Sequence, residues 1–179
     1  MIAFMLIVSL LLALATANTT ANAITCAKGA HLVVARGSLE PQGPGAMGVL
    51  AEEILKLIPG SDMEALVYPA LYADSEGFPS SLSQPAYITD NIAAIIAMGD
   101  PSLTEGQPFL VGTSEGSGIF PRKLPIGCNA IASKTVSICD KGDPYCEASG
   151  KDLSVHLSYI KNYGEFTVGH VVKAWKSRN

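Results

Sequence analysis

The stretch AHLVVARGSLEPQGPGAMGVLAEEILKLIPGSDMEALVY, residues 30–68, indicates the fold class of this chain. Its apolar run 30–35 predicts a buried strand. A helix is predicted next, because apolar residues recur at helical spacing from Met47 to Ile58 before Pro59-Gly60 ends it. A second apolar run, 65–68, predicts another strand. Strand, helix and strand over about 40 residues form a βαβ unit, which implies parallel strands with a right-handed crossover.

The chain beyond this unit continues the alternation of strands and helices. No sustained periodicity is visible from Leu71 to Tyr87, and a helical turn or two is expected at 88–94. The later elements are predicted from short apolar runs and one amphipathic pattern: a central strand at 95–98, an apolar run at 109–111, an edge-ward strand at 135–139 and a helix around 166–175. This order predicts an α/β fold with a mainly parallel sheet.

Composition places the chain among globular proteins with one domain. The chain has 179 residues, of which 48% are hydrophobic and 16% charged, enough to form a real core. Its formal charge of −4 and the absence of a basic stripe make nucleic acid a poor candidate partner.

The first residues predict a secretory signal peptide. Residues 1–15 are apolar but too few to span a bilayer comfortably, so no stable membrane span is expected. A small-x-small pattern at 21–23 places cleavage after Ala23. A signal peptide at 1–23, a domain at 24–179 and an extracellular, secreted protein are therefore expected.

The four cysteines are then interpreted as disulfide candidates, because secretion exposes them to an oxidising compartment. Cys139 and Cys146 are expected to pair, since the short segment between them contains Gly and Pro. Spacing does not tell whether Cys26 and Cys128 pair. A metal site is not expected, because the chain has no C-x-x-C motif and only three histidines.

The segment around the Cys139–Cys146 pair contains a candidate acid and base. Asp143 lies inside the cystine loop and His156 follows it by thirteen positions. The functional interpretation is an aspartate that orients an imidazole, which acts as general base toward a nucleophile. The alternative, a turn aspartate and a surface histidine, is equally compatible with the spacing.

Two serines are candidates to complete such a site. Ser114 stands in the only G-x-S-x-G motif, but the residues after it contain prolines and glycines and cannot form the helix that a nucleophile elbow requires. A serine in a glycine-rich turn is the better interpretation. Ser38 follows the first predicted strand, where it could face an oxyanion or simply stabilise its own turn.

The sequence resembles the cutinase family of secreted serine esterases, in the branch that includes the acetylxylan esterases. The resemblance rests on the following segments: Ala35-Arg36-Gly37-Ser38-Leu39-Glu40, Tyr68-Pro69-Ala70, Ala97-Met98-Gly99-Asp100-Pro101, Ile138-Cys139-Asp140, Gly142-Asp143-Pro144-Tyr145-Cys146, and His156 with Tyr159.

The resemblance implies a three-layer α/β-hydrolase-type sandwich and the hydrolysis of carboxylic esters without a cofactor, through an acyl-enzyme intermediate. Asp143 would orient the ring of His156, His156 would be the base and Ser38 would assist the oxyanion. Substrates in the family include cutin-like polyesters, short acyl esters and acetylated xylan, and a monomer is expected.

One departure from the family is large. Members carry a long helix, a central strand and a Gly-Tyr-Ser-Gln-Gly elbow where this chain has only residues 71–96, so about 30 residues or more are missing there. The nucleophile, one oxyanion N–H group and the usual disulfide partner of Cys26 would be lost with them, and Ser114 does not align with the elbow. Loss of a central strand should also expose an apolar sheet edge.

Three hypotheses follow from this departure. The chain could be an active esterase with a displaced nucleophile, either Ser114 or a serine of the segment 71–84. It could be an inactive relative that serves as a binding protein. It could also be an incomplete gene model of an active enzyme.

Overall fold

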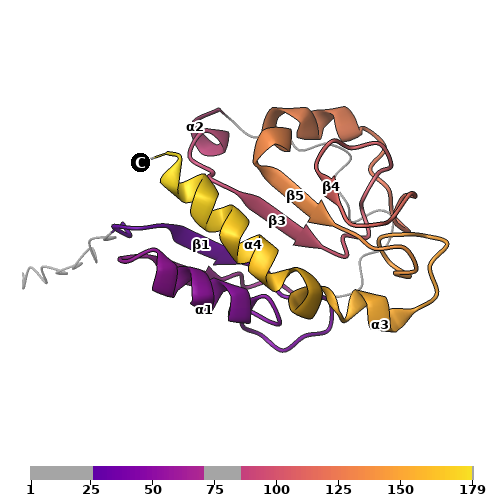
Figure 1. Ribbon diagram of the computed structural model, residues 1–179, viewed down its shortest axis with the longest axis horizontal. Helices are drawn as coiled ribbons and strands as arrows, with labels where there is room; N and C mark the ends of the chain where they lie inside the picture. The colour runs from indigo at the N-terminus through magenta and orange to yellow at the C-terminus, as the bar shows by residue number, and fades with distance from the viewer. Residues whose placement is uncertain (1–25, 71–85, 179) are drawn as a thin grey trace, which may run out of the picture.

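The computed structural model describes residues 26–70 and 86–178 of the chain (Figure 1). The predicted signal peptide, most of the interval in which a family segment is expected to be missing, and the serines of that interval therefore lie outside the described residues.

The amino-terminal βαβ unit has the predicted order. Strand β1 (His31–Val34) is followed by α1 (Gly48–Leu57) and by β2 (Asp62–Ala65), which pairs with β1 in parallel so that Val34 lies opposite Ala65. Strand β2 begins three residues before the predicted run 65–68. The shift has a structural reason, because beyond Ala65 the backbone carbonyl groups of Leu66 and Tyr68 accept hydrogen bonds from the Arg36 guanidinium instead of from a strand.

The second half of the chain forms a three-stranded parallel sheet. It consists of β3 (Ile95–Met98), β4 (Leu110–Val111) and β5 (Thr135–Ile138), in the order β3-β5-β4. The prediction of an edge-ward position for 135–139 was wrong, because β5 pairs with β3 on one side and with the short β4 on the other. Its central position explains why its last residue, Ile138, is fully buried.

The described residues contain four further helices. They are α2 (Ala86–Thr89), the 3-10 helix η1 (Pro125–Lys134), α3 (Leu153–His156) and α4 (Tyr159–Lys176). The turn expected at 88–94 is realised earlier, as α2. The predicted carboxyl-terminal helix is confirmed and begins seven residues before Phe166, at Tyr159.

Helices α1 and α4 lie against each other on the same side of the strands (Figure 1). Their core contains Leu50, Ile54 and Val168, with Leu32 of β1 and Met98 of β3 packed against it. Because Met98 also packs against the core formed by β5, Leu103 and Tyr159, this helical layer joins both sheets.

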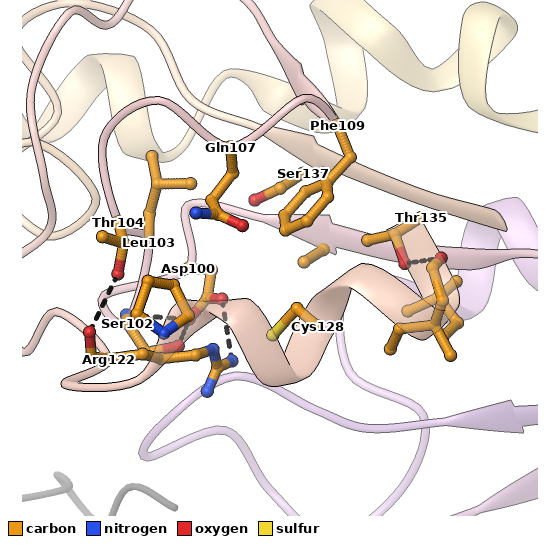
Figure 2. A pocket seen from close by; sticks show the side chains of 14 residues that line it. Asp100, Ser102, Leu103, Thr104, Gln107, Phe109, Arg122, Cys128, Thr135 and Ser137 are labelled. Atoms are coloured by element: carbon orange, nitrogen blue, oxygen red, sulfur yellow. Dashed lines mark hydrogen bonds and ion pairs between the residues drawn. The ribbon is translucent and has the colours of Figure 1, made fainter. Parts of the chain in front are cut away.

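The opposite face of the three-stranded sheet is covered in part by η1. Side chains of successive strand residues point to opposite faces. Val136 and Ile138 pack toward Tyr159 of α4, whereas Thr135 and Ser137 line a cavity together with residues of η1 (Figure 2). Helices on both faces of a parallel sheet give the three-layer α/β arrangement that was predicted.

The strands β1 and β3 belong to different sheets, so within residues 26–70 and 86–178 no ladder of hydrogen bonds joins the two halves. The strand side chains are incompletely covered there: Val33 of β1 is 55% exposed, and all four residues of β3 are only half-buried. In contrast, three of the four residues of β5 are buried. The carboxyl ends of β1, β3 and β5 all point toward the side of the molecule where α3 lies (Figure 1).

Candidate active site

The loop after β5 is held by the predicted disulfide bond. Cys139 and Cys146 are joined, their Cα atoms are 6.0 Å apart, and both residues are fully buried. Gly142 has φ of +98°, a conformation that favours glycine, and its N–H group donates to the carboxylate of Glu147 at 2.8 Å. The loop therefore presents Asp143 from a backbone that is fixed at both ends.

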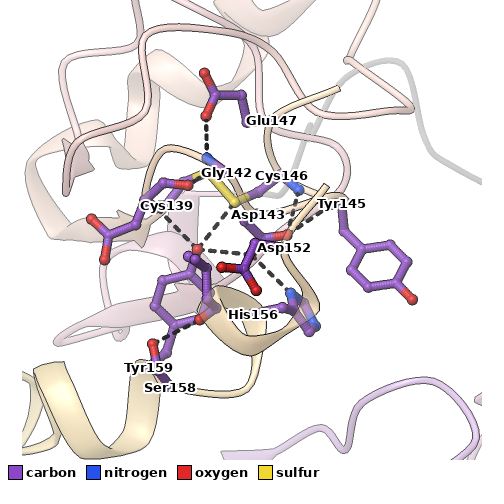
Figure 3. Close-up of polar contacts among 12 residues, drawn as sticks. Cys139, Gly142, Asp143, Tyr145, Cys146, Glu147, Asp152, His156, Ser158 and Tyr159 are labelled. Atoms are coloured by element: carbon purple, nitrogen blue, oxygen red, sulfur yellow. Dashed lines mark hydrogen bonds and ion pairs between the residues drawn. A yellow bond between two sulfur atoms is a disulfide. The ribbon is translucent and has the colours of Figure 1, made fainter. Parts of the chain in front are cut away.

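Asp143 is fully buried, and its carboxylate oxygen atoms are hydrogen-bonded to residues of the cystine loop, of α3 and of α4 (Figure 3). Oδ1 accepts from the N–H groups of Tyr145 and Cys146, at 2.7 and 3.3 Å. Oδ2 is 2.9 Å from Nδ1 of His156 and accepts from the Tyr159 hydroxyl at 2.7 Å. The buried carboxylate is thus surrounded by donors on both oxygen atoms, which is what a buried anion requires.

These contacts determine the charge of Asp143. Burial by itself raises the pKa of its carboxyl group. The hydrogen bonds from His156, from the Tyr145 amide and from Tyr159 outweigh burial, so the pKa lies below its ordinary value of 3.8. Asp143 is therefore an ionised acceptor at neutral pH.

His156 is presented to Asp143 by the short helix α3. Asp152 caps this helix by accepting a hydrogen bond from the Ser154 N–H group at 2.9 Å. Because an ionised carboxylate can only accept, the contact with Asp143 places a proton on Nδ1, and Nε2 of the neutral ring then carries the lone pair. The ring of Tyr145 packs edge-on against the imidazole with centroids 4.6 Å apart, and 29% of the His156 side chain remains exposed.

Gly99 packs directly against the imidazole ring of His156, a contact that the sequence analysis did not predict. It directly follows β3 and has φ of +63°, and a Cβ atom there would lie 2.5 Å from Cε1 and 2.6 Å from Nδ1 of His156. The Gly-Asp-Pro motif gave a signal that this position is special, but the contact itself joins residues far apart in the sequence.

Tyr159 connects the acid loop to the first turn of α4. Its hydroxyl donates to Asp143 and accepts from the Asp140 N–H group at 2.9 Å. Burial and the neighbouring carboxylates raise its pKa well above the ordinary value, so it remains a neutral donor. One turn later Tyr163 donates to Oδ1 of Asp140 at 2.8 Å, and burial together with this bond raises its pKa to about 12.

Ser38 is exposed in the turn after β1. The turn is organised by Glu40, whose carboxylate accepts from the N–H groups of Gly37 and Ala46 at 2.6 and 3.0 Å. Leu39 has φ of +64°, and its N–H group donates to Ala70 at 2.8 Å. Ser38 thus lies at the same end of the parallel strands as His156, and its oxyanion role remains a prediction.

Ser114 lies in a different environment from the one that a nucleophile elbow requires. It is buried, 7% exposed, and its hydroxyl oxygen accepts from the Gly116 N–H group at 3.4 Å within its own turn. Its own N–H group donates to Cys139 at 3.1 Å. No hydrogen bond between Ser114 and His156 occurs in the described part of the chain, so the structure brings together Asp143 and His156 but not this serine.

The remaining cysteines and possible metal ligands are not part of this arrangement. Cys26 is exposed and Cys128 buried, and both are free thiols, which answers the question that spacing left open. The described residues contain no cluster of three or more His, Cys, Asp or Glu side chains suited to a metal ion.

Within residues 26–70 and 86–178, no helix combines the length and apolar character that crossing a membrane demands.

Comparison with known proteins places the chain in a family. A family model described as Cutinase matches residues 80–175. An acetylxylan esterase from Hypocrea jecorina is 29% identical over 193 residues, covering 75% of this chain and 63% of that protein, so this chain spans less than two thirds of its relative.

Two solved structures have a similar fold. An acetyl xylan esterase superposes with a TM-score of 0.73 at 21% identity, over 84% of this chain and 100% of the other. The catalytic core domain of acetyl xylan esterase from Trichoderma reesei gives a TM-score of 0.65 at 26% identity, over 80% and 97% of the two chains. Since the family model covers more than half of the residues and the fold agrees, this chain belongs to the cutinase family.

Proposed function

We propose that this protein is a carboxylic-ester hydrolase of the cutinase and acetylxylan esterase type whose catalysis is impaired. The observation that carries the proposal is the buried Asp143 carboxylate paired with Nδ1 of a partly exposed His156. This pairing leaves the lone pair of Nε2 available as a base, which general-base activation of a hydroxyl group requires.

The chemistry that this pair supports is acyl transfer. Nε2 would take the proton of an attacking hydroxyl group as its oxygen bonds to the ester carbonyl carbon, and the imidazolium would then give that proton to the departing alcohol. Water, activated by the same ring, would release the carboxylic acid in the second half. Each step uses only proton transfer and an oxygen nucleophile, so the mechanism requires no cofactor.

The proposed impairment rests on three observations. The hydroxyl group of Ser114 bonds within its own turn. The strands β1 and β3 lie in separate sheets, where a central strand would be expected. The alignment with the acetylxylan esterase is 193 residues long although it uses only 75% of this chain's 179 residues, so it includes positions that this chain lacks. All three are consistent with the loss of a segment that carries the nucleophile.

The substrate and location are proposed from the relatives and the sequence. Acetylated xylan is the first substrate to test, because the relatives include acetylxylan esterases; short acyl esters and cutin-like polyesters are the other members of the set. Secretion is proposed from the signal-peptide pattern at 1–23, with the domain at 24–179 acting as a monomer outside the cell.

The proposal can be tested with the chain produced from Ile24 onward. We expect p-nitrophenyl acetate hydrolysis that is slow but faster than that of the His156→Ala variant. Labelling with an organophosphonate, followed by peptide mass spectrometry, would identify any nucleophilic serine. The Ser114→Ala variant tests whether this serine is the displaced nucleophile, and the His170→Ala variant is the matched control, since it removes a histidine of α4 outside the Asp143–His156 pair. Hydrolysis equal to that of His156→Ala, with no serine labelled, would overturn the proposed hydrolase function.

A second candidate, a non-catalytic binding protein, is favoured by the separation of β1 from β3. It predicts cooperative unfolding together with hydrolysis no faster than that of His156→Ala. An incomplete gene model instead predicts a longer transcript. Sequencing the transcript between the codons for Ala73 and Phe78 distinguishes the two, because an in-frame insertion encoding Gly-x-Ser-x-Gly would restore an ordinary active esterase.

A further inference from the structure

The Tyr159 hydroxyl group shares one oxygen atom of Asp143 with the imidazole ring of His156 (Figure 3). It donates a hydrogen bond to Oδ2 at 2.7 Å, while Nδ1 of His156 lies 2.9 Å from the same atom. Both Tyr159 and Asp143 are buried. A donor to a carboxylate stabilises its negative charge and therefore reduces the attraction of that charge for a second proton donor. The two hydrogen bonds to Oδ2 are thus coupled.

The loop after β5 holds the Tyr159 hydroxyl group in this orientation. Its oxygen accepts a hydrogen bond from the Asp140 N–H group at 2.9 Å, and its single proton is directed to Asp143. The Asp140 side chain is itself fixed, because Oδ1 accepts from the N–H group and the hydroxyl group of Thr113, both at 3.0 Å, and from the Tyr163 hydroxyl group at 2.8 Å. Each hydrogen bond in such a series polarises the next one. Tyr159 is therefore a fixed and strengthened donor.

The Asp143 carboxylate is the charge that bonds directly to the imidazole. Among the described residues, the titratable groups that face the ring are Asp143 and Tyr145 of the cystine loop and Tyr159 of α4. Gly99, which follows β3 and packs against the ring, carries no charge. The Tyr159 ring lies edge-on to the imidazole with centroids 6.1 Å apart, so its hydroxyl group acts on the ring nitrogen through Asp143.

We propose that Tyr159 is a positioning residue that acts on His156 through Asp143. Its hydrogen bond to Oδ2 withdraws part of the carboxylate charge, so that the acid orients the ring without holding a second proton on it too firmly. The inference rests on the proposed esterase function, in which His156 must take up a proton and return it. Its effect on the ring does not require turnover, and it is therefore measured separately from hydrolysis.

The first test is the Tyr159→Phe variant, observed by NMR of the His156 ring. The phenyl ring preserves the edge-on packing, whereas Oδ2 of Asp143 loses one donor. We expect the Nδ1 proton to move further downfield, because its bond to the carboxylate becomes stronger. The pH midpoint of ring protonation should rise by about 0.5–1 pH unit, the effect of one hydrogen bond. Unchanged signals, or an Nδ1 proton that moves upfield because the site is disordered, would contradict the proposal.

Tyr163→Phe is the matched control for this variant. It removes a tyrosine hydroxyl group one turn later in α4, which donates to Asp140, and no hydrogen bond between Tyr163 and Asp143 occurs in the described part of the chain. Both variants should lose stability, because each removes a hydrogen bond to the loop after β5. The imidazole signals should change in Tyr159→Phe alone. Equal changes in both variants would assign the effect to the packing of α4 and overturn the proposal.

Replacement of Tyr159 by 3-fluorotyrosine keeps the hydroxyl group, so it tests the proposal even where Tyr159→Phe fails to fold. Fluorine makes the phenol a stronger donor. Burial, together with the neighbouring carboxylates, raises the pKa of Tyr159 well above its ordinary value, so the fluorinated group also stays protonated. We expect shifts opposite to those of Tyr159→Phe, with a lower midpoint and an Nδ1 proton less far downfield. Shifts of the same sign in both proteins, or no shift with 3-fluorotyrosine, would show that hydrogen-bond donation is not the cause.

Hydrolysis of p-nitrophenyl acetate separates this inference from the proposed function. Where the unchanged chain is active, the pH at which its rate is half-maximal should rise in Tyr159→Phe by the same amount as the NMR midpoint, because a more firmly protonated ring is a base only at higher pH. A rate profile that does not follow the NMR midpoint would contradict the role in catalysis. Hydrolysis no faster than that of His156→Ala would overturn the esterase function, while the NMR shifts would still decide whether Tyr159 acts on the ring.

Discussion

Single residues determine whether the imidazole can lie against the acid, and Gly99 is the clearest case. Replacing it with alanine would introduce a Cβ atom 2.6 Å from Nδ1 of His156 and strain a backbone with φ of +63°. We expect Gly99→Ala to break the His156–Asp143 hydrogen bond. The measurement is the NMR signal of the Nδ1 proton, which should lose its strong downfield shift.

Gly106→Ala is the matched control for that change. Gly106 has φ of +77°, but a Cβ atom there would have no neighbour within 4 Å. Both variants should lose about 1–2 kcal/mol of unfolding free energy from the left-handed backbone alone. Only Gly99→Ala should alter the imidazole signal. An unchanged signal in Gly99→Ala would show that the ring has room to move and still bond to Asp143.

The charge of Asp143 predicts how stability depends on pH. Its pKa is depressed in the folded protein, so its ionised form contributes stability that is present above the ordinary value of 3.8 and is lost as pH falls through the folded pKa. We expect the free energy of unfolding to decrease between about pH 5 and pH 2, and to decrease less in Asp143→Asn. Urea titrations at several pH values measure this, with Asp90→Asn, an exposed aspartate outside the site, as control.

At the level of elements, the disulfide bond holds the acid loop in shape. The cysteines are separated by seven positions, and closing so short a loop in the unfolded chain is worth about 2–3 kcal/mol. The double variant Cys139→Ala/Cys146→Ala should lose this amount in urea unfolding. Cys26→Ser, which removes an exposed free thiol, should change stability by less than about 0.5 kcal/mol. Equal stability of the two variants would contradict a structural role for the bond.

The turn that carries Ser38 depends on the buried side chain of Arg36. Its guanidinium donates to the backbone carbonyl groups of Glu40, Leu66 and Tyr68 and packs over the Tyr68 ring at 4.7 Å. Arg36→Met should therefore cost about 2–4 kcal/mol, because three partly buried carbonyl groups lose a charged donor. Thermal and urea unfolding would measure the loss.

Arg122→Met is the comparison for Arg36→Met. Arg122 is partly buried and makes one ion pair, at 3.4 Å with Asp100, so Arg122→Met should cost only about 1–2 kcal/mol. A similar loss in both variants would mean that Arg36 acts only through its charge and not through its carbonyl contacts.

Sequence patterns predicted those helices and strands whose own side chains show a local periodicity. The helix at 47–58 and the strand at 30–35 follow from the spacing of their own side chains, and both were found. The central position of β5 could not be predicted in this way, because strand order depends on pairing partners distant in sequence. The same holds for the site. Spacing and resemblance predicted Asp143 and His156, whereas the packing of the His156 ring against Gly99 depends on the folded chain and could not be predicted.

At the level of the whole molecule, the helical layer holds the two sheets together, and no ladder of hydrogen bonds joins them within residues 26–70 and 86–178. The α1–α4 pair forms one core, and Met98 connects it to the other. The sequence analysis expected an exposed apolar edge from a missing strand. The half-exposed side chains of β1 and β3 agree with it, although the interval 71–85 itself lies outside the described residues.

The separation of β1 from β3 has a consequence for the way the protein opens. Amide protons exchange with solvent through the least costly opening that frees them, and weakly connected parts open separately. We expect deuterium uptake in β1 and β2 to follow a local opening, whereas the amides of β5, flanked on both sides, should exchange only when the whole chain unfolds. Native-state exchange at increasing denaturant would separate these two processes, and a single shared exchange free energy would show that the halves act as one cooperative unit.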